Sequence, residues 1–250
     1  MIDAEFGRFE IAEERPFNKN LPDPKRKVTQ DSELKLYITN FNQINLTQTI
    51  LEKYKLLINQ ICKLGDDQQY GSSVEADVNA LRKISERIHF GAFYVAEAKY
   101  QENPKKYSEL ILSENKDGLK SNITNKKVEN DLLDRIKAKT EDLQKNVDAT
   151  KRYKVDSKII IEFYRDIIIP LTKEGEIEYL MNRKNINLFI GKNYEFSANK
   201  NTTGFGCEPS KEDYKGKLTK NINGLLYFDI KGKEVQIHQN DITKIRFLKN

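Results

Sequence analysis

The sequence predicts an all-α helical bundle over residues 1–183, followed by a small β-rich appendage over residues 184–250. In the first part, apolar residues such as Ile50, Leu57 and Ile61 recur at the spacing that places them on one face of a helix. In the second part, glycines punctuate the chain and short apolar runs are separated by turn residues, which is typical of strands. These patterns predict two domains with a boundary near Arg183.

The individual elements follow from the same patterns, with prolines and polar loops as their limits. Five helices are expected, over about residues 46–64, 74–101, 105–113, 125–143 and 156–182. A turn is expected around Asp117 and Gly118, and Pro170 should bend or split the last helix because proline lacks a backbone N–H. Residues 1–45 are expected to form an irregular segment. Strands are expected over residues 225–230, 234–238 and 242–248.

Composition excludes several classes of protein. Charged residues make up 32% of the chain, mean hydropathy is −0.72, and no apolar run approaches the roughly 20 residues that span a bilayer. The cysteines, Cys62 and Cys207, and the histidines, His89 and His238, are too few and too scattered to predict a metal site or a disulfide framework. With no secretory signal in the N-terminal sequence, the sequence predicts a cytoplasmic protein that binds no membrane and no metal.

The net charge of +5 permits nucleic-acid binding but does not require it. Lysine and arginine are interleaved with aspartate and glutamate through most of the chain, which is typical of a solvated surface of mixed charge. We therefore expect no nucleic-acid partner. Binding through the Lys-rich appendage stays open as a weaker alternative.

Several segments together resemble one family of enzymes. RIHFGAFYVAEAKYQENPKKYSELI, over Arg87 to Ile111, resembles the signature helix of eukaryotic, all-helical chorismate mutases of the fungal and plant type. Further segments match family motifs in the same order: GRFEIAEERPFNKNLPDP, GDDQQYGSS, NITNKKVE and IIIPLTKEGEIEYL. The resemblance runs from about Phe6 to Arg183. It implies the Claisen rearrangement of chorismate to prephenate in phenylalanine and tyrosine biosynthesis.

The resemblance also implies which residues carry out the reaction. The shift of bonds is unimolecular and needs no cofactor, so the site must grip a dianionic substrate and stabilise charge on its ether oxygen. Arg87 would hold a carboxylate, since the planar guanidinium of arginine suits a carboxylate, and Lys99 would donate to the ether oxygen. Asn125 and Glu129 would meet polar groups of the substrate, with Glu129 taking the ring hydroxyl.

Two further catalytic residues, Thr172 and Glu176, are four apart on the last expected helix and therefore share a face. Glu176 would donate to the ether oxygen only when protonated, which requires a raised pKa and favours mildly acidic pH. The family resemblance also implies a homodimer regulated by tyrosine and tryptophan. The residues implied in effector binding are Arg8, Gly71 and Ser72.

The sequence departs from the family pattern in three respects. We find no counterpart of the N-terminal helices that supply a further substrate-binding arginine in the family. One residue is extra between Arg87 and Lys99, which would turn them about 120° apart on a regular helix, and we expect a π-bulge near Phe93 and Tyr94 to absorb it. The regulatory loop is altered, with Glu75 in place of a threonine. A non-catalytic module for dimerisation or amino-acid sensing therefore remains the alternative function.

Two expectations concern residues inside the signature segment that have no assigned role in the chemistry. Phe93, Tyr94 and Val95 are expected to lie in the hydrophobic core. His89 is expected to be a structural histidine.

Overall fold

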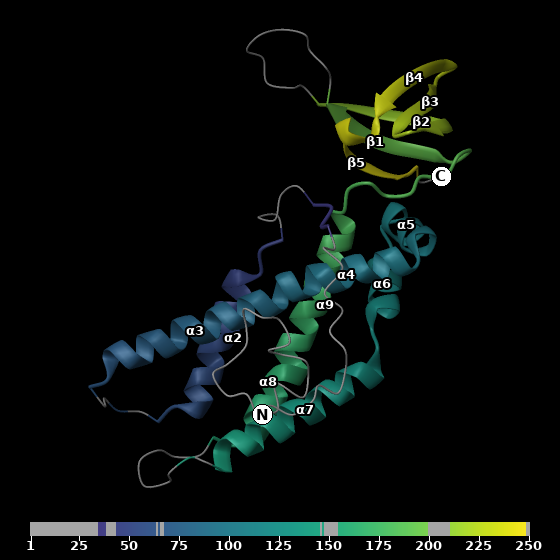
Figure 1. Ribbon diagram of the computed structural model, residues 1–250. Coiled ribbons are helices and arrows are strands. Elements are labelled where there is room, and N and C mark those ends of the chain that lie inside the picture. Colours follow the sequence, from purple (N-terminus) through teal and green to yellow (C-terminus); the bar gives the residue numbers. More distant parts are fainter. Residues whose placement is uncertain are drawn as a thin grey trace, which may run out of the picture.

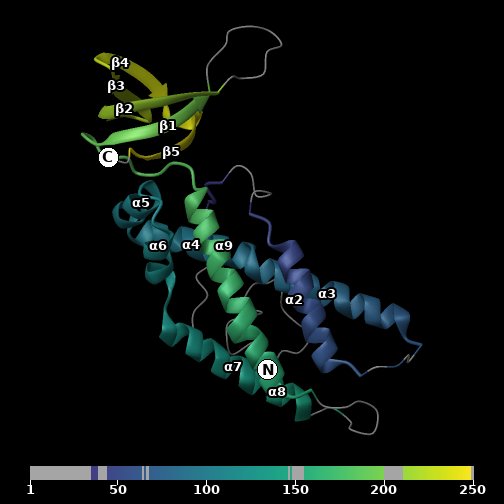
Figure 2. The ribbon, with the colours of Figure 1, turned by 180° about the vertical axis from the view of Figure 1, so that it is seen from behind.

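The computed structural model describes residues 35–38, 44–63, 65, 68–145, 147, 155–199 and 211–248. A group of crossing helices carries an antiparallel sheet at one end, and the two views agree on this arrangement (Figures 1 and 2). The sheet has five strands, so the term all-α applies only to the part before it. One cluster of buried apolar side chains continues from helices α4 and α9 into the sheet.

Most helices lie where the sequence predicts them. They are α2 (Thr47–Ile61), α3 (Tyr70–Ile88), α4 (Phe90–Glu102), α5 (Pro104–Leu112), α6 (Lys116–Ile123), α7 (Lys126–Lys145), α8 (Ser157–Phe163) and α9 (Ile169–Met181). The turn expected at Asp117 and Gly118 is wrong, because both residues belong to α6. The Asn115 side chain accepts a hydrogen bond from the Gly118 N–H at 2.8 Å, so this asparagine caps the helix and does not form a turn.

The expectation of a π-bulge at Phe93 and Tyr94 is also wrong. Residues Phe90–Glu102 form a regular α-helix, and the interruption lies earlier, at His89, which divides the expected helix into α3 and α4. Neighbouring elements hold this residue in place, because the His89 Nε2 accepts a hydrogen bond from the Leu46 N–H at 3.0 Å. The structural role expected of His89 is confirmed. The interruption of the helix between Arg87 and Lys99 therefore lies at His89.

Helices α8 and α9 are joined by one π-helical turn, Tyr164–Ile168, which ends two residues before Pro170. Proline cannot donate the backbone hydrogen bond that an α-helix requires at that position. A π-turn just before it changes the pattern of backbone hydrogen bonds from i→i−4 to i→i−5. The split expected at Pro170 is thus confirmed. At the other end, Asp156 caps α8 by accepting from the Lys158 N–H at 2.9 Å.

Helices α4 and α9 cross closely and form the centre of the helical part. The buried residues of α9 recur at helical spacing, as in Thr172, Glu176, Tyr179 and Leu180. The ring of Tyr179 stacks on that of Phe93 from α4, with 5.5 Å between the ring centroids. The core expectation is confirmed for Phe93 and wrong for its two neighbours, Tyr94 and Val95, which are 48% and 40% exposed.

Gly175 allows the close approach of the two helices. A Cβ atom at this position would lie 3.0 Å from the Ile88 carbonyl oxygen and 3.2 Å from the Ala92 Cβ. We expect Gly175→Val to destabilise the fold by about 1–3 kcal/mol, because the larger side chain must push α9 away from the end of α3 and from α4. Urea denaturation measures this loss, with Glu174→Val at the exposed neighbouring position as the control. Equal loss in both variants would contradict the packing argument.

The sheet has the strand order β4-β3-β2-β1-β5 and all its pairings are antiparallel. The strands are β1 (Asn193–Asn199), β2 (Lys211–Ile222), β3 (Leu225–Ile230), β4 (Lys233–His238) and β5 (Ile242–Phe247). The three expected strands are therefore confirmed, and β1 and β2 were not expected. Positive φ at Asn223 and Gly224, and again at Lys231 and Gly232, gives the hairpin turns the twist that adjacent strands require.

A buried ion pair holds the chain where it leaves α9 for the sheet. Arg183 forms two hydrogen bonds with Glu97 of α4, at 2.8 and 2.9 Å, and the two side chains are 3% and 0% exposed. The hydroxyl of Tyr179 donates to the same carboxylate at 2.8 Å. The guanidinium also lies 3.6 Å from the centroid of the Tyr100 ring. The sequence analysis did not identify this network.

Candidate active site

The candidate site lies where α4 and α9 face the end of α6. The Lys99 ammonium on α4 donates to Glu176 Oε2 on α9 at 2.8 Å and to the Ile123 carbonyl oxygen at 2.7 Å. Glu176 is deeply buried, with 7% of its side chain exposed, while Lys99 is 25% exposed. The structure therefore joins two predicted catalytic residues that are 77 positions apart in the sequence.

The environment of Glu176 makes its carboxyl group hard to ionise. Burial raises the pKa of this group, because the charged form loses its hydration. Three nearby cations act in the opposite direction, Lys99 most strongly, then Arg87 and Lys173, and they only partly offset the effect of burial on the pKa. Glu176 thus has the raised pKa that its predicted role as a proton-bearing donor requires.

Arg87 is an exposed residue near the end of α3, four positions before Gly91 of α4. Its guanidinium would come within 3.0 Å of a Cβ atom at Gly91, so this side chain crosses over the start of α4. The positive charge of Arg87 acts to lower the pKa of Glu176, less strongly than that of Lys99. The structure thus joins Lys99 to Glu176 directly, and it places Arg87 near enough to act electrostatically on the same carboxyl group.

Glu129 belongs to the first turn of α7 and reaches across to α9. Its carboxylate forms an ion pair with the ammonium of Lys173 at 2.8 Å, and both side chains are mostly buried, at 24% and 20% exposure. Lys173 also acts electrostatically on Glu176. This lysine links the two acidic groups of the candidate site.

Thr172 and Asn125 make local hydrogen bonds in the described structure. The buried Thr172 hydroxyl donates to the Ile168 carbonyl oxygen at 2.7 Å, at the end of the π-turn. Asn125 is exposed and precedes α7, where its side chain accepts a hydrogen bond from the Val128 N–H at 3.2 Å. Each can form a further hydrogen bond, because the threonine oxygen can still accept one and the asparagine amide can still donate one.

Two residues that the sequence analysis missed contribute to the site. Lys173 follows Thr172 directly, and a search for charged neighbours of the predicted site residues on α9 would have found it. Tyr107 of α5 is buried, and its pKa is raised by burial and then by the nearby negative charge of Glu176. Nothing in the sequence distinguishes Tyr107 from the other tyrosines.

The residues predicted to bind effectors lie away from the catalytic cluster. Gly71 and Ser72 are exposed in the first turn of α3. The first turn of a helix is a position where backbone N–H groups commonly bind an anionic group. Arg8 lies outside the described residues.

Other classes of site find little support in the described ranges. No group of three or more potential ligands there could hold a metal ion. None of the helices that are described is long and apolar enough to cross a membrane. On the sheet, Lys215 pairs with Glu195 and Lys220 with Glu234, so part of its positive charge is neutralised locally.

Comparisons with known proteins agree on one family. No family model matches the chain. It is 35% identical over 180 residues to a chorismate mutase of Schizosaccharomyces pombe, and the match covers 70% of each chain. It is 32% identical over 198 residues to the chloroplastic chorismate mutase 1 of Arabidopsis thaliana, and the match covers 73% of this chain and 57% of that protein.

Solved structures give the same result. The chorismate mutase of Candida albicans in complex with L-Trp matches with a TM-score of 0.55 and 34% identity, covering 74% of this chain and 71% of that one. The structure of AtCM1, which holds phenylalanine in an allosteric site, matches with a TM-score of 0.52 and 34% identity, and 73% of each chain is covered. The chain belongs to the chorismate mutase family.

Proposed function

We propose that this chain is a chorismate mutase, an isomerase that rearranges chorismate to prephenate without a cofactor. The observation that carries the proposal is the contact of Lys99 with the buried Glu176, with Arg87 and Lys173 close enough to act on the same carboxyl group. A dicarboxylate substrate needs cations to bind it, and the reaction needs donors aimed at the ether oxygen. This cluster supplies both.

The geometry supports separate roles for the residues around the ether oxygen. Lys99 has three N–H donors, of which the Ile123 carbonyl and Glu176 take two. The remaining donor is available to the substrate. When Glu176 is protonated, its hydroxyl becomes a second donor in a largely dry site, where such hydrogen bonds are strong. We assign stabilisation of the developing negative charge to these two groups.

We assign substrate binding to the residues around Lys99 and Glu176. Arg87 is exposed and free of the constraints of the core, so its guanidinium can meet a carboxylate with two parallel hydrogen bonds. Glu129 is held by its ion pair with Lys173, and its carboxylate oxygens can accept a hydrogen bond from the ring hydroxyl. Thr172 and Asn125 complete the proposed set of polar contacts.

Membership of the family also supports proposals about the regulation of this protein, its oligomeric state and its location in the cell. The Candida albicans enzyme is a complex with L-Trp, and AtCM1 holds phenylalanine or tyrosine in an allosteric site. We infer that this chain forms a homodimer and binds tyrosine or tryptophan at a site that includes Arg8, Gly71 and Ser72. We place the protein in the cytoplasm, where its activity would serve phenylalanine and tyrosine biosynthesis.

The pH dependence of prephenate formation tests the proposed function. We expect kcat/KM to be highest at mildly acidic pH and to fall as the pH rises through the raised pKa of Glu176, because only the protonated carboxyl donates. The Glu176→Gln variant has an amide that donates at every pH, so this fall should disappear. The measurement is the loss of chorismate and the appearance of prephenate from about pH 4 to about pH 9.

A matched control is Glu178→Gln, which removes a partly exposed carboxylate from the same helix, outside the candidate site, and should leave the profile unchanged. If chorismate is not consumed at any pH while the chain binds an aromatic amino acid, the alternative of a non-catalytic sensing module replaces this proposal. If the wild type turns over but Glu176→Gln keeps the same fall with pH, the role of Glu176 is wrong.

A further inference from the structure

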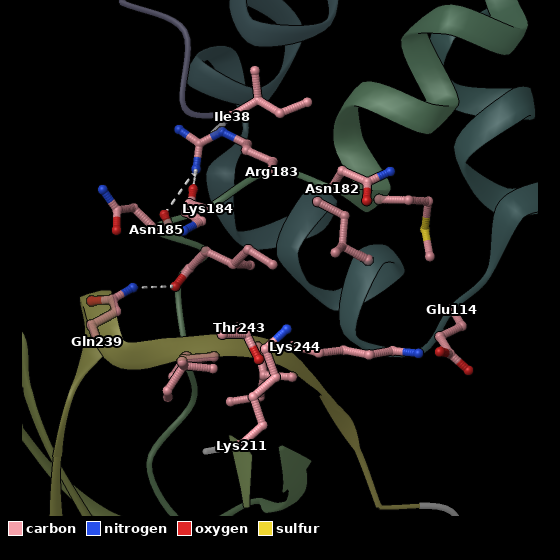
Figure 3. Close-up of a pocket in the computed structure, with 16 residues that line it drawn as sticks. Ile38, Glu114, Asn182, Arg183, Lys184, Asn185, Lys211, Gln239, Thr243 and Lys244 are labelled. Atoms are coloured by element: carbon pink, nitrogen blue, oxygen red, sulfur yellow. Dashed lines mark hydrogen bonds between the residues drawn. The ribbon is translucent and has the colours of Figure 1, made fainter. Parts of the chain in front are cut away.

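A cavity of about 460 Å³ lies where the chain leaves α9 and meets the sheet (Figure 3). Its walls come from the end of α9, the turn after α5, the segment after Arg183 and strand β5. None of the candidate catalytic residues lines it. The volume lies within the range of about 300–1,000 Å³ that is usual for small-molecule sites.

The walls of the cavity are held in place by contacts on three sides. Arg183 is fixed by the buried carboxylate of Glu97 and donates to the carbonyl oxygens of Lys184 and Asn185, both at 2.8 Å. Gln239 donates to the Ile186 carbonyl oxygen at 3.2 Å, as Figure 3 shows. Such cross-links between helix, connecting segment and sheet favour a cavity that exists before any ligand binds.

The charged side chains of the lining are mostly positive. Lys184, Lys211 and Lys244 all line the cavity, and their ammonium groups form no ion pair within the part of the chain that is described. The lining carboxylate, Glu114, is engaged by Arg246 of β5 at 3.2 Å. The balance of charge therefore favours an anion in the cavity.

The remaining walls are largely apolar. Aliphatic side chains from the helical part and from the sheet face each other across the space, and they include Ile38, Ile111, Leu188, Ile242 and Ile245. All five belong to, or pack against, the continuous core, so the surface behind them is dry. An apolar wall under a rim of lysines suits a ligand with one apolar end and one anionic end.

We propose that this cavity binds a small amphipathic organic anion, a carboxylate with an aliphatic or aromatic body. The carboxylate lies among Lys184, Lys211 and Lys244, and the body lies against Ile242 and Ile245. The binding site does not depend on the mutase reaction, because the two sites share no lining residue. Failure of one proposal therefore leaves the other intact.

Calorimetric titration of the full chain with three eight-carbon probes tests the proposal. Octanoate, octanol and octylammonium have the same apolar body and differ in the charge of one end. We expect saturable binding of one octanoate per chain, binding of octanol weaker by about tenfold or more, and no saturable binding of octylammonium. Absence of saturable octanoate binding, or equal affinity for octylammonium, overturns the proposal.

Paired charge reversals then locate the site. The double variant Lys211→Glu with Lys244→Glu should weaken octanoate binding by about tenfold or more. The control pair is Lys217→Glu with Lys233→Glu, two exposed lysines of the sheet that do not line the cavity, and it makes the same change in net charge. Circular dichroism of both variants checks the fold. Equal weakening by the two pairs would show non-specific attraction to the sheet and would overturn the assignment.

Discussion

Replacing Lys99 with alanine is expected to lower kcat for prephenate formation by about 10²–10³-fold. The Lys99 ammonium is held by hydrogen bonds to the Ile123 carbonyl and to Glu176, so its position is set before the substrate arrives. A donor that needs no reorganisation stabilises the transition state more than the bound substrate, and its loss therefore appears in kcat. Steady-state kinetics with chorismate measures the effect.

The control for this prediction is Lys116→Ala. Lys116 also pairs with a glutamate of α9, Glu178, at 2.6 Å, but its side chain is 58% exposed and lies outside the candidate site. Both variants lose one lysine and one ion pair with a glutamate of α9, but only Lys99 belongs to the candidate site. A loss of kcat that is similar in the two variants would remove Lys99 from the proposed mechanism.

Replacing Arg183 with alanine is expected to destabilise the protein by about 3–5 kcal/mol. The variant leaves the Glu97 carboxylate fully buried without its bidentate partner. It also removes the cation that lies 3.6 Å from the centroid of the Tyr100 ring. The free energy of unfolding in urea measures the loss. Arg165→Ala is the matched control, because the Arg165–Asp166 pair is 53% and 55% exposed and exposed ion pairs contribute little to stability.

The effect of pH distinguishes this explanation from a simple loss of packing. Burial raises the pKa of Glu97, but hydrogen bonds from Arg183, Gln101 and Tyr179 outweigh it, so the pKa lies below its ordinary value. The stabilisation is therefore present above the ordinary pKa and is lost as the pH falls through the lowered value. The difference between wild type and Arg183→Ala should shrink in acid. A difference that is constant with pH would indicate packing alone.

The sequence predicts elements well where one face of the element is apolar. Helices α2 and α5 and strands β3 and β4 have strong periodic patterns, and they lie within a few residues of their predicted positions. Strand β2 was missed because its burial pattern leaves nearly every second residue in solvent and buries only Leu218 fully. Helix α6 was missed because Gly118, Ser121 and Asn122 are typical of turns, while tertiary burial of Leu119 and Ile123 stabilises the helix.

The candidate site was predicted in part for a similar reason. The family motifs indicated Lys99 and Glu176, and the structure adds that burial raises the pKa of the glutamate. Lys173 contacts Glu129 of another helix, and Tyr107 lies near Glu176 of another helix. Such contacts depend on how the helices pack, which a local sequence pattern does not reveal. The position of the helix interruption also escaped prediction, because it depends on the contact of His89 with the backbone of Leu46.

The Glu97–Arg183 pair sets a lower limit on how far the chain can be shortened from its C-terminal side. A protein cut after Met181 would keep every residue of the proposed reaction centre, yet it would leave a negative charge inside the crossing of α4 and α9 with nothing to balance it. Anyone who wished to isolate the helices for crystallisation or directed evolution would have to retain Arg183 or neutralise Glu97 in the same step.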